Sequence, residues 1–474
     1  MKEHILFLTG KLAENRLQNV LDSMQSCNFT YEVRNIGVSV AALMTAGMIG
    51  RRLNEVHGFD RIIVPGLCRG DFTKLETDLG VPVIKGAKDL KDLPEYFGND
   101  SKPIDLSKHN VKIFAEIVDA AELSIDKIIE QAQAYVSDGA DVIDIGCLPD
   151  TDFPHLEETV SILKSEGFIV SVDSLDSDEL LRGGGAGADF LLSLKESSLW
   201  IANEVCAIPV LIPEHHPQVD SLYRSMDKLS EDGKPFIADS ILDPIHFGFT
   251  ESILRYYNMR ERFPDCEIMM GVGNLTELTE ADTSGINAIL FGIISELEID
   301  NVLTTQVSPH ACSAIREADK ARRMFFAARQ QGSLPKDIDN SLLTTHERKP
   351  FPYSADEISE LAAEIKDPSF RIQVSENGIH VYNRDGIETA LNPHKLFAEL
   401  ESLQNDAPHA FYMGVELAKA QIAMQLGKRY IQDQELLWGA AVAKSTGEEV
   451  AGENEYDKPG ATLQASQKVS KKKS

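Results

Sequence analysis

One pattern recurs eight times between residues 111 and 330: an apolar strand, a turn with acidic residues or glycine, and an amphipathic helix. Strands that alternate with helices form parallel sheets, and eight such units in about 220 residues close into a (β/α)8 TIM barrel. The strands are expected at 111–118, 141–146, 168–173, 189–194, 208–213, 236–242, 267–273 and 301–307. A further apolar run, 286–294, stands where the seventh helix must lie, so we assign it to that helix.

A smaller α/β pattern precedes the barrel domain, for which we expect bounds of 108–330. Residues 1–105 contain the short apolar strands HILFLTG and RIIVPG with helical stretches between them, which predicts a small parallel, Rossmann-like domain. The turn at Thr9 and Gly10 either closes the sheet or offers backbone amides to an anion. Neither GxGxxG nor GxxxxGK[ST] follows it, so a nucleotide site is not indicated.

The C-terminal part reads as a third unit after a linker at 331–347. Residues 348–445 contain a hairpin with its turn at Asn377 and Gly378 and a long helix rich in Ala, Lys, Glu and Gln, which indicates a small α+β domain. Residues 446–474 are polar and charged, and we expect them to be disordered.

Composition excludes several classes of protein. Asp and Glu number 75 against 46 Lys and Arg, for a net charge of −29, which disfavours nonspecific binding to nucleic acids or anionic membranes. No apolar run approaches the roughly 18 residues of a membrane helix, and the start MKEHILFLTG lacks the long apolar core of a signal peptide. The six cysteines include no CxxC pair, so neither a zinc site nor a disulfide framework is predicted. We expect a cytoplasmic protein with no nucleic-acid or membrane partner.

Three of the predicted strands deliver an aspartate to the same edge of the barrel: Asp144, Asp173 and Asp243. The carboxyl ends of the strands are where TIM barrels bind ligands, so these carboxylates indicate a site. An aspartate at this place can instead cap the following helix, and for Asp144 both interpretations stay open. His215 and His216 follow the fifth strand, where they either bind an anion or a metal or belong to a solvated loop.

Four motifs in barrel order resemble the pterin-binding barrels, a family that includes dihydropteroate synthase and the methyltetrahydrofolate–corrinoid methyltransferases. The motifs are GADVIDIG, VSVDS with AGADFLLS, ILDPIHFGF and MGVGN, and the resemblance covers residues 110–325. With its α/β head and the tail motif HAFYMGVELAKAQIAMQLGKRYIQD, the whole chain is similar to the dihydropteroate synthase-related proteins. These occur in archaea and in methylotrophic bacteria that make tetrahydromethanopterin.

The resemblance implies a pterin site made of carboxylates. Asp243 would accept the 2-amino group and the ring N–H of a reduced pterin, a charge-assisted bidentate pairing. Asp173 would contact the other edge of the ring, and Asn274 would bind the edge with N5 and the carbonyl group. Asp144 and Ser193 would touch the pterin or support the residues that do.

The chain also departs from the pattern of dihydropteroate synthases. Thr250 and Asn274 stand where those enzymes carry lysines, and 305–307 lacks their Arg-x-His. Glu116 replaces their metal-linked asparagine, so magnesium is expected through Glu116. Contacts to phosphate or to an arylamine at the mouth are expected from His246, Ser308 and His310.

We therefore expect a transferase of tetrahydromethanopterin biosynthesis that needs Mg²⁺. It would join a dihydropterin methyl diphosphate to a ribofuranosyl-aminobenzene unit and release diphosphate, as a homodimer or higher homo-oligomer. Two alternatives are a pterin-dependent methyltransferase with a corrinoid partner and a non-catalytic pterin-binding subunit. A diphosphate-releasing enzyme needs cationic groups at the mouth, for which His246, His310 and Arg316 are candidates, whereas the alternatives do not.

Overall fold

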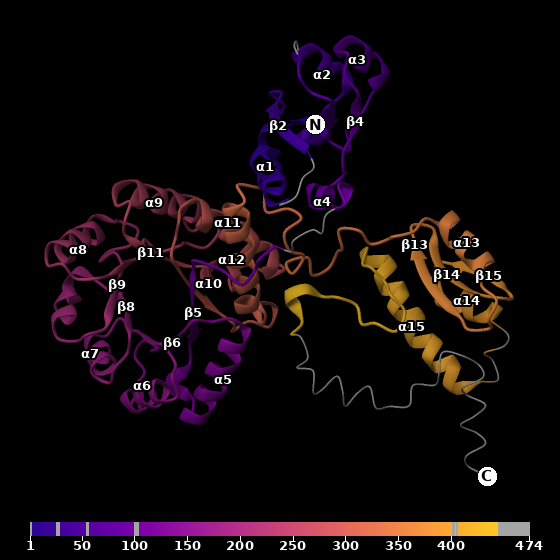
Figure 1. Ribbon diagram of the computed structural model, residues 1–474. Coiled ribbons are helices and arrows are strands. Elements are labelled where there is room, and N and C mark those ends of the chain that lie inside the picture. Colours follow the sequence, from indigo (N-terminus) through magenta and orange to yellow (C-terminus); the bar gives the residue numbers. More distant parts are fainter. Residues whose placement is uncertain are drawn as a thin grey trace.

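The computed structural model describes residues 2–24, 29–53, 56–98, 104–400, 403 and 406–443. Three bodies follow one another along the chain: a small N-terminal domain, a large barrel and a C-terminal domain (Figure 1). The segment predicted to be disordered, 446–474, lies outside the described residues. None of the helices in the described part of the chain combines the length and hydropathy of a membrane-spanning segment.

The central body is a (β/α)8 TIM barrel, which confirms the predicted fold. Its strands close in the order β10-β11-β12-β5-β6-β7-β8-β9, and every neighbouring pair is parallel. The strands are β5 (Lys112–Ile117), β6 (Val142–Gly146), β7 (Val170–Asp173), β8 (Phe190–Leu194), β9 (Ile208–Leu211), β10 (Ile237–Ala238), β11 (Glu267–Gly271) and β12 (Asn301–Thr305).

Helices surround the strands, as Figure 1 shows. They are α5 (Ile125–Asp138), α6 (Leu156–Ser165), α7 (Ser177–Gly185), α8 (Asp220–Glu231), α9 (Phe249–Arg262), the short α10 (Gly273–Thr276), α11 (Thr283–Glu296) and α12 (Ala314–Gln330). Between β8 and β9 a 3-10 helix, Glu196–Asn203, takes the place of an α-helix. The apolar run 286–294 belongs to α11, as predicted.

Two strands are shorter than the sequence predicts. The run 236–242 is apolar, but β10 ends at Ala238 because the carboxylate of Asp239 accepts the backbone N–H of Ile241 at 2.7 Å and turns the chain. The prediction that a strand carries Asp243 at its end was therefore wrong, because Asp243 lies in the following loop. Likewise β11 ends at Gly271, so Asn274 belongs to α10 and not to a strand.

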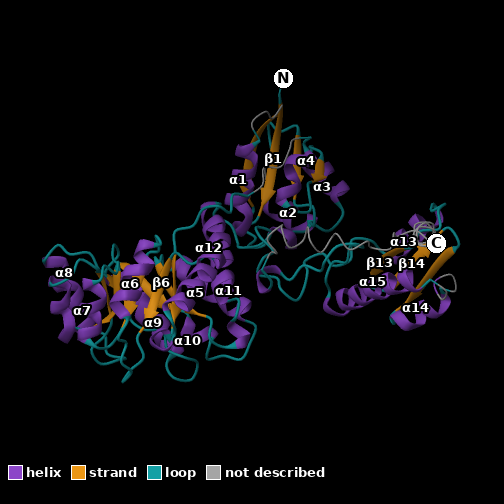
Figure 2. Ribbon diagram, turned by 90° about the horizontal axis from the view of Figure 1, so that it is seen from below, coloured by secondary structure: helices purple, strands orange, loops and turns teal. Residues whose placement is uncertain are grey.

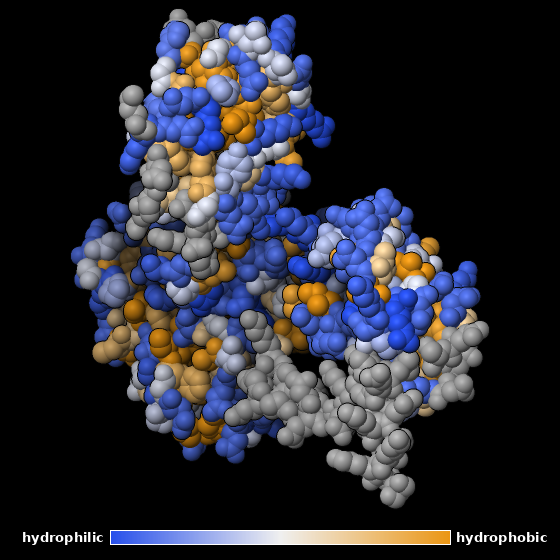
Figure 3. Space-filling view, turned by 45° about the vertical axis from the view of Figure 1, so that its right-hand side comes forward, coloured by the Kyte–Doolittle hydropathy of each residue, from blue (hydrophilic) through white to orange (hydrophobic). Residues whose placement is uncertain are grey.

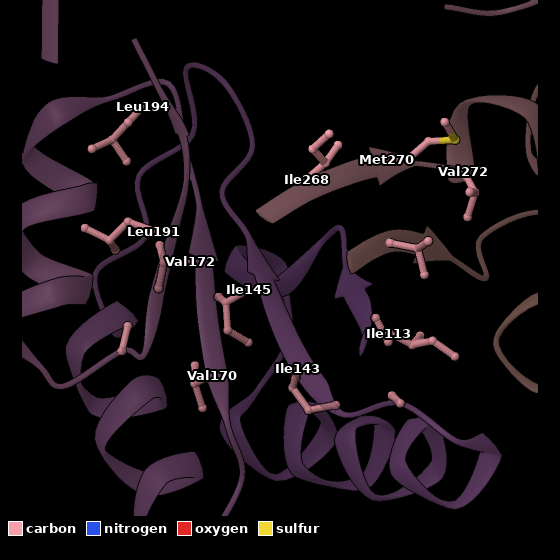
Figure 4. Close-up of a cluster of buried hydrophobic side chains, with 14 of the residues drawn as sticks. Ile113, Ile143, Ile145, Val170, Val172, Leu191, Leu194, Ile268, Met270 and Val272 are labelled. Atoms are coloured by element: carbon pink, nitrogen blue, oxygen red, sulfur yellow. The ribbon is translucent and has the colours of Figure 1, made fainter. Parts of the chain in front are cut away.

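Side chains alternate between the inside and the outside of the barrel, as expected for strands. The inner cluster consists of Phe114, Val142, Phe190, Leu192, Val210, Ile237 and Met269. The residues that neighbour them along each strand point outward into the core between strands and helices, for example Ile113 on β5 and Ile143 on β6. Figure 4 shows part of this outer core. The alternation decides which polar side chains reach the lumen.

The N-terminal domain is a four-stranded parallel sheet in the order β2-β1-β3-β4, which confirms the predicted small α/β unit. Its strands are β1 (Glu3–Thr9), β2 (Phe29–Asn35), β3 (Arg61–Val64) and β4 (Val83–Lys85), and its helices are α1 (Glu14–Ser23), α2 (Ala46–Arg52), α3 (Phe72–Leu79) and α4 (Leu93–Tyr96). Leu6 and Leu8 face one apolar cluster and Ile5 and Phe7 the other, so the central strand is buried on both faces.

The C-terminal domain has the predicted hairpin and long helix. Its antiparallel strands are β13 (Arg371–Ser375), β14 (Gly378–Asn383) and β15 (Gly386–Ala390), and its helices are α13 (Ala355–Ala363), α14 (Pro393–Glu399) and α15 (Ala407–Leu426). Apolar residues of β13 and β14 pack with residues of α14 and α15 in one cluster. This arrangement confirms a small α+β domain after the barrel.

Candidate active site

Three carboxylates meet at the carboxyl ends of β5, β6 and β7. Glu116 lies two residues after Phe114, and Asp144 lies two residues after Val142, so both acids share the inner face with that cluster. The strand register pairs Glu116 with Asp144 directly, and Asp173 is the last residue of β7. One ligand atom from each of these three residues lies within 4.8 Å of the others. The structure thus brings together acids that the sequence assigned to separate roles.

Asp144 is the most buried member of this acidic cluster, defined as Glu116, Asp144 and Asp173. Its side chain is fully buried, and its Oδ1 accepts a hydrogen bond from the Ser171 hydroxyl at 2.5 Å. Its Oδ2 is buried and has no hydrogen-bond partner among the described residues. An unpaired buried oxygen costs about 1–3 kcal/mol, so Asp144 is suited to a bound proton, a cation or an N–H donor.

Burial raises the pKa values of all three acids of the cluster, and repulsion adds to the shift for Glu116 and Asp144. Burial raises the pKa of Glu116 to about 7, and the charge of Asp173 adds to the effect. Burial, then the charges of Asp173 and Glu116, hold the pKa of Asp144 well above its usual range. Burial also raises the pKa of Asp173, although a hydrogen bond with Ser193 opposes the shift. Like charges this close favour the neutral forms until a positive partner arrives.

A fourth acid, Asp239, was missed in the sequence because it stood inside a predicted strand. It follows β10 and lies two residues after Ile237, so it shares the inner face with that residue. Its Oδ1 accepts the hydroxyl of Tyr256 at 2.5 Å. Burial raises the pKa of Asp239 to about 6 against the Tyr256 and Ile241 hydrogen bonds, and Asp173 adds repulsion. The period of two from Ile237 was the signal that could have found it.

Asp243 is held by two basic side chains. Its Oδ1 accepts from His216 Nε2 at 2.7 Å, and its Oδ2 accepts from Arg255 Nη2 at 2.7 Å. Arg255 also donates to the carbonyl oxygens of Ser240 and Ile241. Asp243 and Arg255 are 10% and 11% exposed, so their ion pair is largely shielded from solvent. His216 thus contacts a candidate site residue, and Arg255 is a basic residue that the sequence did not single out.

Removing the charge of Asp243 is expected to lower the free energy of unfolding by about 1–3 kcal/mol, because Arg255 loses a shielded ionic partner. Asp243→Asn in urea unfolding tests this. The matched control is Asp232→Asn, whose carboxylate pairs with Lys228 at 3.1 Å on the surface and should matter far less. Equal losses from the two variants would contradict the expectation.

Two other predicted pterin residues support the acids. Asn274 Nδ2 donates to the carbonyl oxygen of Leu242 at 2.8 Å and so braces the loop that carries Asp243. Ser193 has a positive φ of 65° at an irregularity in β8, and its side chain hydrogen-bonds Asp173. Through these contacts, Asn274 and Ser193 would act on a ligand in the lumen only indirectly.

The residues predicted for phosphate or arylamine contacts lie in two loops. His246 is exposed in the loop after β10. The backbone N–H of Ser308 donates to Glu277 Oε2 at 2.8 Å, and His310 Nε2 lies 3.2 Å from the carbonyl oxygen of Thr276. Glu277, which the sequence did not single out, therefore ties the loop after β12 to the segment after β11.

Comparisons with known proteins cover different parts of the chain. Residues 3–88 match a family of unknown function, DUF6513. Nearly the whole chain is similar to the uncharacterized protein MJ0107 of Methanocaldococcus jannaschii, with 27% identity over 91% of this chain and 98% of that protein.

Solved structures of dihydropteroate synthases are also similar. The enzyme of Yersinia pestis with a pterine–sulfa conjugate is 16% identical, with a TM-score of 0.35 over 48% of this chain and 95% of that chain. The 7,8-dihydropteroate synthase of Vibrio fischeri is 13% identical, with a TM-score of 0.36 over 48% of this chain and 95% of that chain. The barrel fold itself is defined by the strand order described above.

Proposed function

We propose that this protein is a pterin-binding transferase of the dihydropteroate synthase type that acts in tetrahydromethanopterin biosynthesis. It would join a dihydropterin methyl diphosphate to a ribofuranosyl-aminobenzene unit and release diphosphate. The observation that carries the proposal is the convergence of inward-facing carboxylates at the barrel mouth, where Asp144 Oδ2 has no hydrogen-bond partner among the described residues. The acids are Glu116, Asp144, Asp173 and Asp239.

A reduced pterin supplies hydrogen-bond donors for the carboxylates of this mouth. Its 2-amino group and neighbouring ring N–H are adjacent donors, which a carboxylate accepts in bidentate fashion. We assign these donors to Asp243, place Asp173 at the other edge of the ring and add Asp239 as a third acceptor. Asp243 remains suitable because a carboxylate has about four acceptor positions and two are in use. The four sequence motifs that resemble pterin-binding barrels support a pterin over other ligands with N–H donors.

The acidic cluster also fits magnesium. Glu116, Asp144 and Asp173 offer hard oxygen donors within 4.8 Å of one another, and carboxylate oxygens are ligands that Mg²⁺ prefers. These three residues would hold the ion, and a bound magnesium would neutralise negative charge on a departing diphosphate. A cation would also offset the burial, and relieve the added repulsion, that raise the pKa values of Glu116 and Asp144.

Basic residues near the mouth differ in what they are free to bind. His216 and Arg255 both lie against Asp243. Arg316, by contrast, is engaged by Asp138 and by the carbonyl oxygen of Ala440, so we do not assign it to the mouth. Arg255 is likewise engaged, by Asp243 and by the carbonyl oxygens of Ser240 and Ile241, so we assign Arg255 and His216 to holding Asp243 in place. His246, exposed in the loop after β10, would face the anionic end of the substrate.

Calorimetric titration with dihydropterin methyl diphosphate, with and without Mg²⁺, tests the proposal. We expect binding that magnesium strengthens, followed by diphosphate release when the ribosylated arylamine is added, and faster release than with p-aminobenzoate. Deletion of the gene should abolish tetrahydromethanopterin and leave folate intact.

Three outcomes would contradict parts of this assignment. Absence of pterin binding would reject the site. Pterin binding without diphosphate release would favour the non-catalytic subunit. Methyl transfer from a reduced methylpterin to a corrinoid protein would favour the methyltransferase.

A further inference from the structure

The N-terminal domain contains a cavity of about 220 Å³ that is separate from the barrel mouth. It lies at the carboxyl ends of β1 and β3, against residues 7–9 and 63–65, and continues to the residues after β4, 86–90. Figure 2 shows the strands of this domain running from the outer end of the molecule toward the loops that join the domains. Residues of the segment after α12, among them Leu334 and Asp337, form the opposite wall.

The position is where an open parallel sheet offers a ligand site. In the order β2-β1-β3-β4, the chain leaves β1 toward β2 on one side, and β3 lies on the other side. The crevice outside the carboxyl ends of such strands is the usual binding place in open α/β sheets. A Cβ on Gly66 would lie 2.5 Å from the carbonyl oxygen of Ala87, so the loops after β3 and β4 approach each other closely only because of this glycine.

The walls of the cavity are mainly apolar. Phe7, Leu17, Ile63 and Leu93 form a buried floor. Larger apolar side chains remain exposed around the cavity: Leu12, Val40, Leu67 and Leu334 are 41–51% exposed. Figure 3 shows apolar surface on this domain, the uppermost body in the view. A ligand with an apolar ring system would cover this surface.

The charged groups of the cavity are unbalanced in favour of positive charge. Of its two acids, Asp89 pairs with Lys349 at 3.7 Å, and Asp337 pairs with Arg348. The basic residues of the wall are Arg16, Lys88 and Lys336. Within the described part of the chain, none of these three lies within 4.0 Å of a carboxylate oxygen. The wall therefore has spare cations in a protein with a net charge of −29.

Arg16 is the basic residue best placed to hold an anion. Its Nη1 donates to the carbonyl oxygen of Lys336 at 2.9 Å, which orients the guanidinium beside the segment after α12. Burial lowers the pKa of Arg16, against the nearby charge of Asp89. A partly desolvated guanidinium forms strong charge-assisted bonds with carboxylate, sulfonate or phosphate groups.

We propose that this cavity is a second ligand site, specific for an amphipathic organic anion. The apolar ring system would lie against Phe7, Leu17 and Ile63, and its single anionic group would bind Arg16. This assignment concerns the N-terminal domain and the segment after α12, and it does not depend on the ligand of the barrel.

Two fluorescent probes with one apolar body test the proposal in the full-length protein. 8-Anilinonaphthalene-1-sulfonate carries an anionic group, and N-phenyl-1-naphthylamine lacks it. We expect one site for the anionic probe. Arg16→Gln should weaken its binding at least about tenfold and leave the neutral probe unchanged. Arg16→Lys should retain most of the affinity, because the charge is kept.

Two further variants test whether both probes bind in the cavity and whether the loss of any positive charge weakens binding. Ala42 lines the cavity and is exposed, so Ala42→Trp should fold and should block both probes. Arg51→Gln removes an exposed charge of α2 outside the cavity and should change neither. Circular dichroism checks the fold of every variant. If Arg16→Gln does not fold, rising salt should still weaken only the anionic probe.

Unchanged affinity for the anionic probe in Arg16→Gln would overturn the assignment. So would full binding of both probes in Ala42→Trp, or equal losses in Arg16→Gln and Arg51→Gln. Binding of a carboxylate or a phosphate in competition with the sulfonate probe would identify which anionic group the natural ligand carries.

Discussion

Replacing Asp173 with asparagine is expected to weaken the binding of a reduced pterin by about 2–4 kcal/mol, because an amide substitutes for a charged acceptor. Asp173 interacts with the two other acids of the acidic cluster and also with Asp239. One of its oxygens lies within 4.8 Å of a ligand atom of Glu116 and of Asp144, and its charge adds to the burial that raises the pKa of Asp239. Isothermal titration with a dihydropterin at pH 8, where the cluster is more ionised, measures the loss.

The matched control for this experiment is Asp178→Asn. Asp178 is exposed in the first turn of α7, the helix that follows β7. Its replacement therefore removes one negative charge from the same βα unit, outside the lumen. Its effect on affinity should be small. If Asp173→Asn bound the pterin as tightly as the wild type, or if the two variants lost the same affinity, Asp173 would not be a pterin ligand.

Replacing Glu116 with glutamine is expected to stabilise the ligand-free protein at pH 8 by on the order of 3 kcal/mol. The pKa of Glu116 rises in the folded state from an ordinary 4.5 to about 7. The folded protein therefore binds the proton more tightly than the unfolded chain. This stabilisation is fully present below pH 4.5 and is lost as the pH rises through 7. Glutamine resembles the neutral acid and carries no charge to lose.

Urea unfolding at pH 5 and at pH 8 measures this effect. Trp200 lies in the barrel and Trp438 in the C-terminal region, so fluorescence in a Trp438→Phe background reports the barrel alone. The difference between wild type and Glu116→Gln should be large at pH 8 and small at pH 5. Glu130→Gln, on the exposed face of α5, should show no such dependence. An equal difference between wild type and Glu116→Gln at both pH values would contradict the expected pH dependence.

The same unfolding experiment, repeated with Mg²⁺, also tests whether the acidic cluster binds the ion. If the acidic cluster holds the ion, Mg²⁺ should stabilise the wild type at pH 8 and should stabilise Glu116→Gln much less, because one oxygen ligand loses its charge. The free-protein measurement depends on burial and on the charge of Asp173, with no ion added, so its result is separate from the assignment of the metal.

Local pattern was sufficient for the architecture. The barrel follows from strands and helices that alternate eight times, and each unit is visible within a short window of sequence. The flanking domains follow for the same reason. The acids on β5, β6 and β7 could also be placed at one mouth, because parallel strands present all their carboxyl ends at the same edge.

The composition of the site depended on contacts between residues far apart in sequence. Hydropathy predicts a strand through 236–242, but Asp239 hydrogen-bonds Ile241 and Tyr256, which ends the strand at Ala238. Asp239 keeps the inward direction set by Ile237, and the turn that follows moves Asp243 into a loop. No periodicity predicts that His216 and Arg255 then close on Asp243, since the three residues come from separate segments of the chain.

The sequence by itself therefore determined the barrel, its flanking domains and the edge where the acids gather, because these depend on periodicity and chain direction. Only the tertiary structure decided which acids share a volume and which have basic partners. It also decided that burial and the nearby charge of Asp173 raise the pKa of Glu116 to about 7. The same holds for the cavity of the N-terminal domain, whose wall includes a segment that follows Arg16 by more than 300 residues.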